Sequence, residues 1–281
     1  MSELEALLLG IVQGLTEFLP ISSSGHLIIV PWLQDYTFLE DHEKFNKTFD
    51  VALHAGTLVA AISYFRHEVV TYLGAFVRTV RTRAIETVDE RVACAIAVGT
   101  VPAVIAGGLG SGFIEDHLGE PWMIGIQLIV FGALLGWADR LPERRDVEGL
   151  TLRDGLYVGL AQVLALAPGT SRSGITITAA RYLGFDRDSA ARVSFLLLIP
   201  AVAGATVYSA YKAIHDGLPN DVAGPIIVGT IASAVSGYIA IAWLLRLLRT
   251  HSYRPFVIYR YFAGAAILLL IATGVRSVTF G

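Results

Sequence analysis

Long apolar runs alternate with short polar segments along most of the chain, and six runs reach the length of a membrane-spanning helix. Such a helix needs about 20 residues, and about 17 at the lower end of the range. The predicted spans are Phe49–Phe65, Val92–Phe113, Trp122–Ala138, Val193–Tyr211, Val222–Leu245 and Val257–Thr273. The pattern therefore predicts an all-α integral membrane protein with six transmembrane helices.

The remaining apolar segments form two pairs, each interrupted by proline, serine and glycine. Glu3–Leu19 precedes Ser24–Leu33, and Leu156–Ala167 precedes Gly174–Gly184. Three of these four legs have roughly 10 to 12 residues, or about 15–18 Å of helix, which is about half of a hydrocarbon core. Irregular turns at membrane depth are tolerated only inside protein or beside a polar cavity. We therefore expect a re-entrant helical hairpin over 3–33 and another over 156–184.

Arginines gather in three of the connections, as they do in cytoplasmic loops. They follow Phe65 (Arg66, Arg78, Arg81, Arg83, Arg91), Ala138 (Arg140, Arg144, Arg145, Arg153) and Leu245 (Arg246, Arg249, Arg254, Arg260). By contrast, Ile114–Pro121 has no Lys or Arg, and 212–221 has only Lys212. We expect the basic connections to be cytoplasmic loops and both termini to be external. The first hairpin then enters from outside and the second from the cytoplasm, with Arg181, Arg187 and Arg192 at its foot.

The predicted path divides into two halves of opposite orientation within a single membrane domain. Residues 1–138 and 155–281 each hold one hairpin and three spans, so an inverted-topology repeat is expected, with 139–154 as the boundary. Two short matches lie 149 residues apart: Gly10-x-x-Gln13 with Gly159-x-x-Gln162, and Ser24-Gly25 with Ser173-Gly174. The opposed topology is the stronger of the two arguments.

Composition supports membrane integration. The 281 residues are 54% hydrophobic and 16% charged, with a mean hydropathy of +0.60, whereas soluble domains average about 25% charged residues. The net charge of −3 argues against a nucleic-acid partner. The single cysteine, Cys94, lies in an apolar run and forms no intrachain disulfide. The first residues include Glu3 and Glu5 and lack the basic residues with which a signal peptide begins, so no cleavable signal is expected.

The turn of the second hairpin carries candidate chemistry. Pro168-Gly169 ends one leg, and hydroxyl side chains follow that can cap the next helix (Thr170, Ser171, Ser173). A helix start is a natural anion site, and Arg172 adds a bidentate donor for phosphate oxygens. The alternative is that Arg172 snorkels to an interface or forms a structural salt bridge. The half-helix lengths place it too deep to snorkel, which favours function.

The turn of the first hairpin has the same design. Ser22, Ser23 and Ser24 precede Gly25-His26, and Gln13 and Glu17 are four apart on one helix face. The natural partner of Glu17 is Arg172, a bound metal or a protonated ligand. The serines could instead be helix caps, and the histidine a core residue. Asp50 and His54, also four apart, could line the entrance or simply pack.

These motifs resemble a known family. Gln13-x-x-x-Glu17, then Pro20-x-Ser22-Ser23-Ser24-Gly25-His26 and later Pro168-Gly169-x-Ser171-Arg172-Ser173-Gly174, is similar to the bacitracin-resistance undecaprenyl-diphosphatase family. The resemblance extends over essentially the whole chain, including Phe256–Tyr261. It implies a membrane hydrolase of a phosphoric anhydride, which converts undecaprenyl diphosphate to the monophosphate, recycles the lipid carrier for cell-envelope glycans and confers bacitracin resistance. Many members have Glu in place of Gln13, which can only hydrogen-bond.

The resemblance also assigns residues. The expected catalytic residues are Glu17, Ser23, His26 and Arg172, with Glu17 also a metal ligand for a divalent cation, Mg²⁺ or Ca²⁺. The expected substrate-binding residues are Gln13, Ser22, Ser24, Gly169, Thr170, Ser171, Ser173 and Thr176. The nucleophile is either Ser23, deprotonated by His26, or a water activated by His26 or Glu17. The expected partners are the polyprenyl diphosphate, membrane lipids and a second copy of the chain, with the site open to the external face of the plasma membrane.

Transport is the competing function class. Opposed repeats with half-helices at the midplane would also suit a carrier or flippase for an anionic polyprenyl phosphate lipid. A histidine, a serine and a glutamate in one cluster favour chemistry, because a carrier needs charge but no nucleophile.

Overall fold

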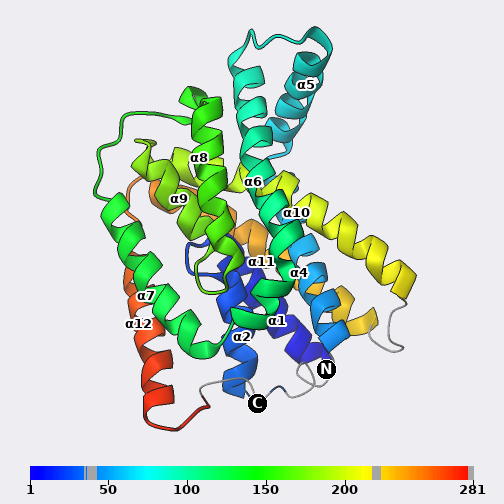
Figure 1. Cartoon of the computed structure of the whole chain (residues 1–281), viewed down its shortest axis with the longest axis vertical. Helices are drawn as coiled ribbons and strands as arrows, with labels where there is room; N and C mark the ends of the chain where they lie inside the picture. Colours follow the sequence, from blue (N-terminus) through cyan, green and yellow to red (C-terminus); the bar gives the residue numbers. More distant parts are fainter. Residues whose placement is uncertain (35, 37–42, 217–222, 278–281) are drawn as a thin grey trace.

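The computed structural model describes residues 1–34, 36, 43–216 and 223–277, and its regular elements are helices (Figure 1). In chain order they are α1 (Glu3–Phe18), α2 (Ser23–Gln34), α4 (Glu43–Tyr64), α5 (Arg66–Thr82), α6 (Val88–His117), α7 (Pro121–Ala138), η1 (Val147–Gly149), α8 (Leu152–Val163), η2 (Leu164–Leu166), α9 (Arg172–Tyr182), α10 (Arg187–Asp216), α11 (Ala223–Leu248) and α12 (Arg254–Ala272). The predicted all-α class is confirmed.

Five helices, α6, α7, α10, α11 and α12, are each long and apolar enough to cross a membrane. They coincide with five of the predicted spans. The remaining prediction, Phe49–Phe65, falls on α4, which qualifies only when it is joined to α5 as one span bent by 86°. The fold is therefore that of a multi-pass membrane protein with five to six candidate spans. Residues 217–222 and 278–281, which include parts of the predicted external segment and the C-terminus, lie outside the described residues.

We expected residues 66–91 to be a cytoplasmic loop, but the first part of this segment is the helix α5. Apolar residues recur along that helix at a helical spacing, at Val70, Leu73, Val77 and Val80, and all four are exposed. Arg66, Arg78 and Arg81 in the same helix make the segment read as polar when only its composition is considered. A helix with apolar residues at this spacing and charged residues among them has the pattern of an amphipathic helix.

The short legs of the two predicted hairpins are also helices of the expected length. α1, α2, α8 and α9 have 16, 12, 12 and 11 residues. α1 ends just before Pro20, which cannot continue a helix hydrogen-bond ladder, and α9 is followed by Gly184 at φ +91°. In each pair an irregular segment joins the legs, at 19–22 and at 167–171.

Small residues let the first leg of each pair approach another helix closely. α1 packs along α11, where a Cβ at Gly10 or Gly14 would collide with the backbone of α11. α8 packs along α6 in the same way, through Gly155 and Gly159. Such contacts are typical of helix packing in membranes. They hold both first legs rigidly against longer helices.

The segment 139–154 is fastened to the folded protein rather than free. Arg187 donates to Asp139 at 2.6 Å, and the backbone N–H groups of Arg144 and Arg145 donate to the carbonyl of Gly184 at 2.9 and 3.1 Å. Arg181, which we expected as a charged residue at the foot of the second hairpin, is instead fully buried and donates to the carbonyls of Asp139 and Leu141. Backbone carbonyls explain how the burial of this cation is tolerated.

Candidate functional site

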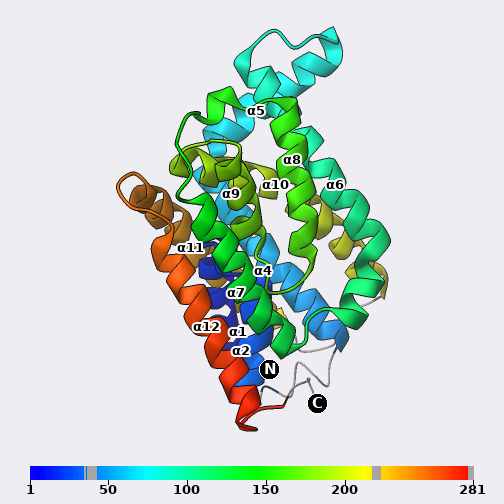
Figure 2. The ribbon, with the colours of Figure 1, turned by 60° about the vertical axis from the view of Figure 1, so that its left-hand side comes forward.

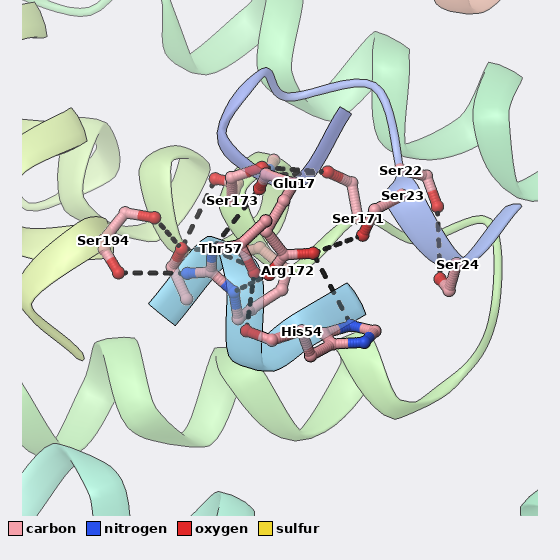
Figure 3. A network of polar contacts seen from close by, with 12 residues as sticks. Glu17, Ser22, Ser23, Ser24, His54, Thr57, Ser171, Arg172, Ser173 and Ser194 are labelled. Carbon is pink, nitrogen blue, oxygen red and sulfur yellow. Dashed lines mark hydrogen bonds and ion pairs between the residues drawn. The ribbon is translucent and has the colours of Figure 1, made fainter. Parts of the chain in front are cut away.

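The two irregular turns meet inside the helix bundle (Figure 3). The backbone N–H of Gly169 donates to Ser22 Oγ at 3.2 Å, and Ser173 Oγ donates to the carbonyl of Leu19 at 3.0 Å. The second turn therefore supplies both donors and the first turn both acceptors. The prediction that these segments, about 150 residues apart in the chain, come together is confirmed by their contacts.

A serine with an unusual backbone conformation shapes each turn. Ser22 has φ +79° and Ser171 has φ +74°, values that residues other than glycine rarely adopt. Each serine Oγ accepts the backbone N–H three residues later, from Gly25 at 3.2 Å and from Gly174 at 3.0 Å. These bonds start α2 and α9. The first N–H groups of both helices lack intrahelical acceptors, so both helix ends are suited to bind an anion.

A buried ion pair joins the two turns. Arg172 Nε and Nη2 each lie 3.3 Å from Glu17 Oε1, and Arg172 Nη1 donates to the carbonyl of Ser194 at 3.0 Å. The side chain of Glu17 is 4% exposed and that of Arg172 is 15% exposed. Among the partners predicted for Glu17, the arginine is the one that the structure places there. Arg172 is held from two sides, with part of its guanidinium still accessible.

The second oxygen of Glu17 gathers the other polar groups. Ser23 Oγ donates to Glu17 Oε2 at 2.5 Å, and Gln13 Nε2 donates to the same atom at 3.1 Å. His54 Nε2 lies 3.7 Å from it, which is ion-pair distance when the imidazole is protonated. His54 therefore borders the carboxylate directly, whereas the sequence suggested only that it lines an entrance or packs. The serine hydroxyl is aligned by a carboxylate beside a guanidinium, a geometry suited to nucleophilic attack.

His26 lies in the first turn but is not hydrogen-bonded to Ser23. Its Nδ1 is 2.7 Å from the carbonyl of Ser22, and its Nε2 is 2.6 Å from the hydroxyl of Tyr259. A carbonyl accepts only, so Nδ1 carries the proton and, in the neutral ring, Nε2 accepts from the tyrosine. The expected contact between Ser23 and His26 is therefore absent from this geometry, and Glu17 takes its place.

The other predicted binding residues surround this cluster. Thr170 Oγ1 donates to Gln127 Oε1 at 2.8 Å, and Thr176 Oγ1 donates to Ser194 Oγ at 2.7 Å. Ser24 Oγ is 3.5 Å from Ser22 Oγ, and Ser173 Oγ is 3.3 Å from Ser171 Oγ. Thr170 and Thr176 are thus engaged by protein groups that orient the turn and α9. A direct role for them in binding a substrate stays a prediction.

Arg260 is the residue that sequence reasoning misplaced. We expected it in a cytoplasmic connection, but it is fully buried and donates to the carbonyls of both turns. The acceptors are Pro20 in the first turn, Gly169 and Thr170 in the second, and Gln127 and Leu128 in α7. The signal was available, because Arg260 falls inside the predicted span Val257–Thr273, where a cation is costly unless partnered. Tyr259, whose hydroxyl contacts His26, was also missed.

Oxygen donors for a divalent cation are few but present. Within the described ranges, no group of three or more His, Cys, Asp and Glu side chains is placed to hold a metal ion. Gln13 Oε1 is buried without a hydrogen-bond partner, beside the carboxylate of Glu17. Mg²⁺ commonly takes one or two carboxylates and completes its coordination with water and substrate phosphates. Glu17 and Gln13 fit such a partial site.

Comparisons with known proteins agree with these motifs. Residues 6–266 match the family model described as "Bacitracin resistance protein BacA". The chain is 44% identical to an undecaprenyl-diphosphatase of Pelobacter propionicus, over 98% of this chain and 99% of the relative. It is 47% identical to one of Geobacter sulfurreducens, over 95% and 98%, and 46% identical to one of Nocardioides sp., over 97% of both chains.

Proposed function

Because this chain belongs to the bacitracin resistance protein family, we propose that it is an undecaprenyl-diphosphatase. It releases the terminal phosphate of undecaprenyl diphosphate and so returns the lipid carrier to cell-envelope synthesis. The observation that supports this most directly is the hydroxyl of Ser23, held 2.5 Å from the carboxylate of Glu17 beside Arg172. A carrier for an anionic lipid would need the cation but not an aligned hydroxyl.

We propose a two-step displacement on Ser23. The Ser23 oxygen bonds to the terminal phosphorus, its proton passes to Glu17 Oε2, and the bond from phosphorus to the bridging oxygen breaks. Undecaprenyl phosphate leaves with the electron pair of that bond. Water then bonds to the phosphorus of phosphoserine and the bond from phosphorus to the Ser23 oxygen breaks. Glu17 returns its proton to the Ser23 oxygen, and the phosphate leaves with the protons of the water. Glu17 is favoured over His26 as the first proton acceptor because Ser23 is hydrogen-bonded to Glu17.

Arg172 and the two helix starts supply the positive field that phosphoryl transfer requires. Arg172 is fixed by Glu17 and by the carbonyl of Ser194, so its remaining N–H groups are oriented before a ligand arrives. Ser24, Ser171 and Ser173 lie at the same helix starts and are the proposed phosphate-binding hydroxyls. A divalent cation, Mg²⁺ or Ca²⁺, would be held by Glu17 and Gln13 and would neutralise charge on the diphosphate.

The proposed topology is an inverted repeat of two re-entrant hairpins and six spans. Its support is a reciprocal packing pattern: the first leg of the first hairpin lies on α11, and that of the second lies on α6. These two helices are the second predicted spans of opposite halves. α4 with α10 and α7 with α12 also pair across the halves. Such exchange is expected from a two-fold axis in the membrane plane.

The proposed location is the plasma membrane, with the site open to the external face. Figure 1 places residue 1 at the opposite end of the molecule from the arginine-rich α5. Cysteine labelling at Ser2 tests the orientation, and labelling of that position only from the cytoplasmic side would contradict it. A homodimer is a further proposal, tested by measuring the mass of the protein in detergent by light scattering.

The decisive experiment measures phosphate released from undecaprenyl diphosphate by the purified protein in detergent. Detergent offers no second compartment, so transport cannot account for product. We expect a pre-steady-state burst of the lipid monophosphate, the product of the first step, and a phosphoryl group on Ser23 after acid quenching. If the protein releases no phosphate, transport of an anionic lipid would be the better-supported function. Hydrolysis with Ser23 unmodified during turnover would keep the phosphatase and replace the serine by an attacking water.

A further inference from the structure

A cavity of about 770 Å³ lies between the end of α7 and the beginning of α12, apart from the residues of the two turns. The two helices run side by side in both views of the ribbon (Figures 1 and 2). Its volume is in the range of sites that bind small amphiphilic molecules, about 300–1,000 Å³. None of the residues proposed to act in hydrolysis lines it.

One end of the cavity is cationic. Arg140, Arg187 and Arg254 line it together with one carboxylate, that of Asp139. Arg187 is already committed, because it donates to Asp139 at 2.6 Å and to Glu143 at 2.6 Å. The ion pairs found among the described residues include neither Arg140 nor Arg254. Arg140 and Arg254 therefore line the cavity without an ion-pair partner among these pairs.

The other end of the cavity is apolar and open to the surroundings. Going away from Arg254 along α12, the lining continues through Ile258 to Tyr261, and α7 contributes Ala133, Gly136 and Trp137. Ile258 is 56% exposed and Trp137 is 52% exposed, on helices that qualify as membrane spans. Tyrosine and tryptophan at such helix ends are typical of the level of the lipid headgroups. The cavity thus has a charged head region and an apolar flank in the order that a lipid has.

We propose that this cavity binds a membrane phospholipid with an anionic headgroup. The phosphate lies between Arg140 and Arg254, and the acyl chains lie along Trp137 and Ile258. Basic pockets between transmembrane helices bind anionic headgroups in this manner. A soluble anion would use the two arginines but not the exposed apolar flank, so the two ends of the cavity together select a lipid.

The experiment titrates delipidated protein in neutral detergent with phosphatidylglycerol and counts bound lipid by native mass spectrometry. We expect one saturable phosphatidylglycerol. The double variant Arg140→Gln/Arg254→Gln should weaken its binding about 25-fold, since each arginine near a headgroup contributes a factor of about five. The matched control is Arg249→Gln, which removes an exposed arginine that does not line the cavity and should change binding less than about twofold.

Two further arms make the result unambiguous. Phosphatidylcholine has the same phosphate with no net charge, and it should bind more weakly than phosphatidylglycerol. Inorganic phosphate at the same concentration should not displace the lipid. The double variant should still hydrolyse undecaprenyl diphosphate, which shows that it is folded. Equal binding by the double variant and the control, or displacement by inorganic phosphate, would overturn the proposal.

Discussion

The two turns have the same backbone design but carry different chemistry. Ser22 and Ser171 have φ angles of +79° and +74°, each accepts the N–H of the glycine three residues on, and each starts a helix. The residue that follows is Ser23 in the first turn and Arg172 in the second. Equivalent backbone positions thus present a hydroxyl from one side and a guanidinium from the other.

This comparison shows where a repeated scaffold can diversify. The serines with positive φ cost of order 1–3 kcal/mol each, and a glycine would relieve that strain. Glycine, however, has no Oγ to accept the helix N–H or, at Ser22, the N–H of Gly169. The strained serines are therefore part of the scaffold in both turns. The first helical residue, directly after the capping serine, differs between the turns, and the chemistry lies there.

The largest expected effect comes from removing the hydroxyl that distinguishes the first turn. Ser23→Ala should lower turnover about 10⁴-fold or more, because a nucleophile and its aligning groups act as a unit. Binding of the lipid diphosphate, measured by calorimetry, should persist. Thr79→Ala, which removes a hydroxyl of α5 outside the site, serves as the control. Substantial turnover by Ser23→Ala would assign the attack to water.

The next largest effect tests the residue that distinguishes the second turn. Arg172→Lys keeps the positive charge but loses the planar fork that contacts Glu17 and Ser194. We expect turnover to fall about 10²–10³-fold. Phosphate release measured at saturating substrate separates this loss from weaker binding. A variant with nearly normal turnover would return Arg172 to a structural role.

A third prediction concerns the residue that holds the two turns together. Arg260→Met fills similar space but leaves several buried carbonyls of Pro20, Gly169 and Thr170 without donors. The cost should be about 3 kcal/mol or more in stability, with loss of activity, because unmet buried acceptors cost about 1–3 kcal/mol each. Thermal unfolding in detergent measures it. Arg246→Met, at an exposed position of α11, should have little effect. An equal shift of the unfolding temperature in both variants would contradict the proposal that Arg260 holds the two turns together.

The smallest expected effect compares the starts of the two first legs. Both α1 and α8 begin with a capping box, formed by Ser2 with Glu5 and by Thr151 with Asp154. Burial alone would raise the pKa of Asp154, but hydrogen bonds from Arg145 and Thr151 outweigh it and hold that pKa below its ordinary value. Asp154→Asn should therefore cost about 1–2 kcal/mol more than Glu5→Gln at neutral pH.

The pH dependence of that difference has a definite sign. A carboxyl with a lowered pKa in the folded state adds stability above its unfolded pKa, about 3.9, and loses it as the pH falls through the folded value. The difference in unfolding temperature between Asp154→Asn and wild type should be constant from pH 8 to about 5 and shrink below about pH 4. A difference that grew on acidification would refute the assignment.

Helix lengths and the pairing of the turns could be predicted from the sequence, and several partners could not. Apolar run length is a local property, so α6, α7, α10, α11 and α12 were found. One carboxylate and one cation among short apolar legs left few partners, so Glu17 and Arg172 could be paired. The contact of His26 with Tyr259 spans 233 positions and depends on how α12 is rotated, which no local pattern reports. Arg260 was overlooked for the same reason. The helix α5 was overlooked because its arginines make an amphipathic segment look polar.

The position of Arg260 in the chain sets an order of assembly. Its guanidinium reaches the carbonyl of Pro20 across 240 positions, and α12 is the last helix that the structure describes to leave the ribosome. The first turn is synthesised long before the arginine that completes its hydrogen bonds. Until α12 inserts, both turns hold unmet carbonyls, and the site cannot acquire its final shape. A nascent chain paused before α12 is therefore a membrane-inserted but inactive protein, so catalytic competence arises only at the end of biogenesis.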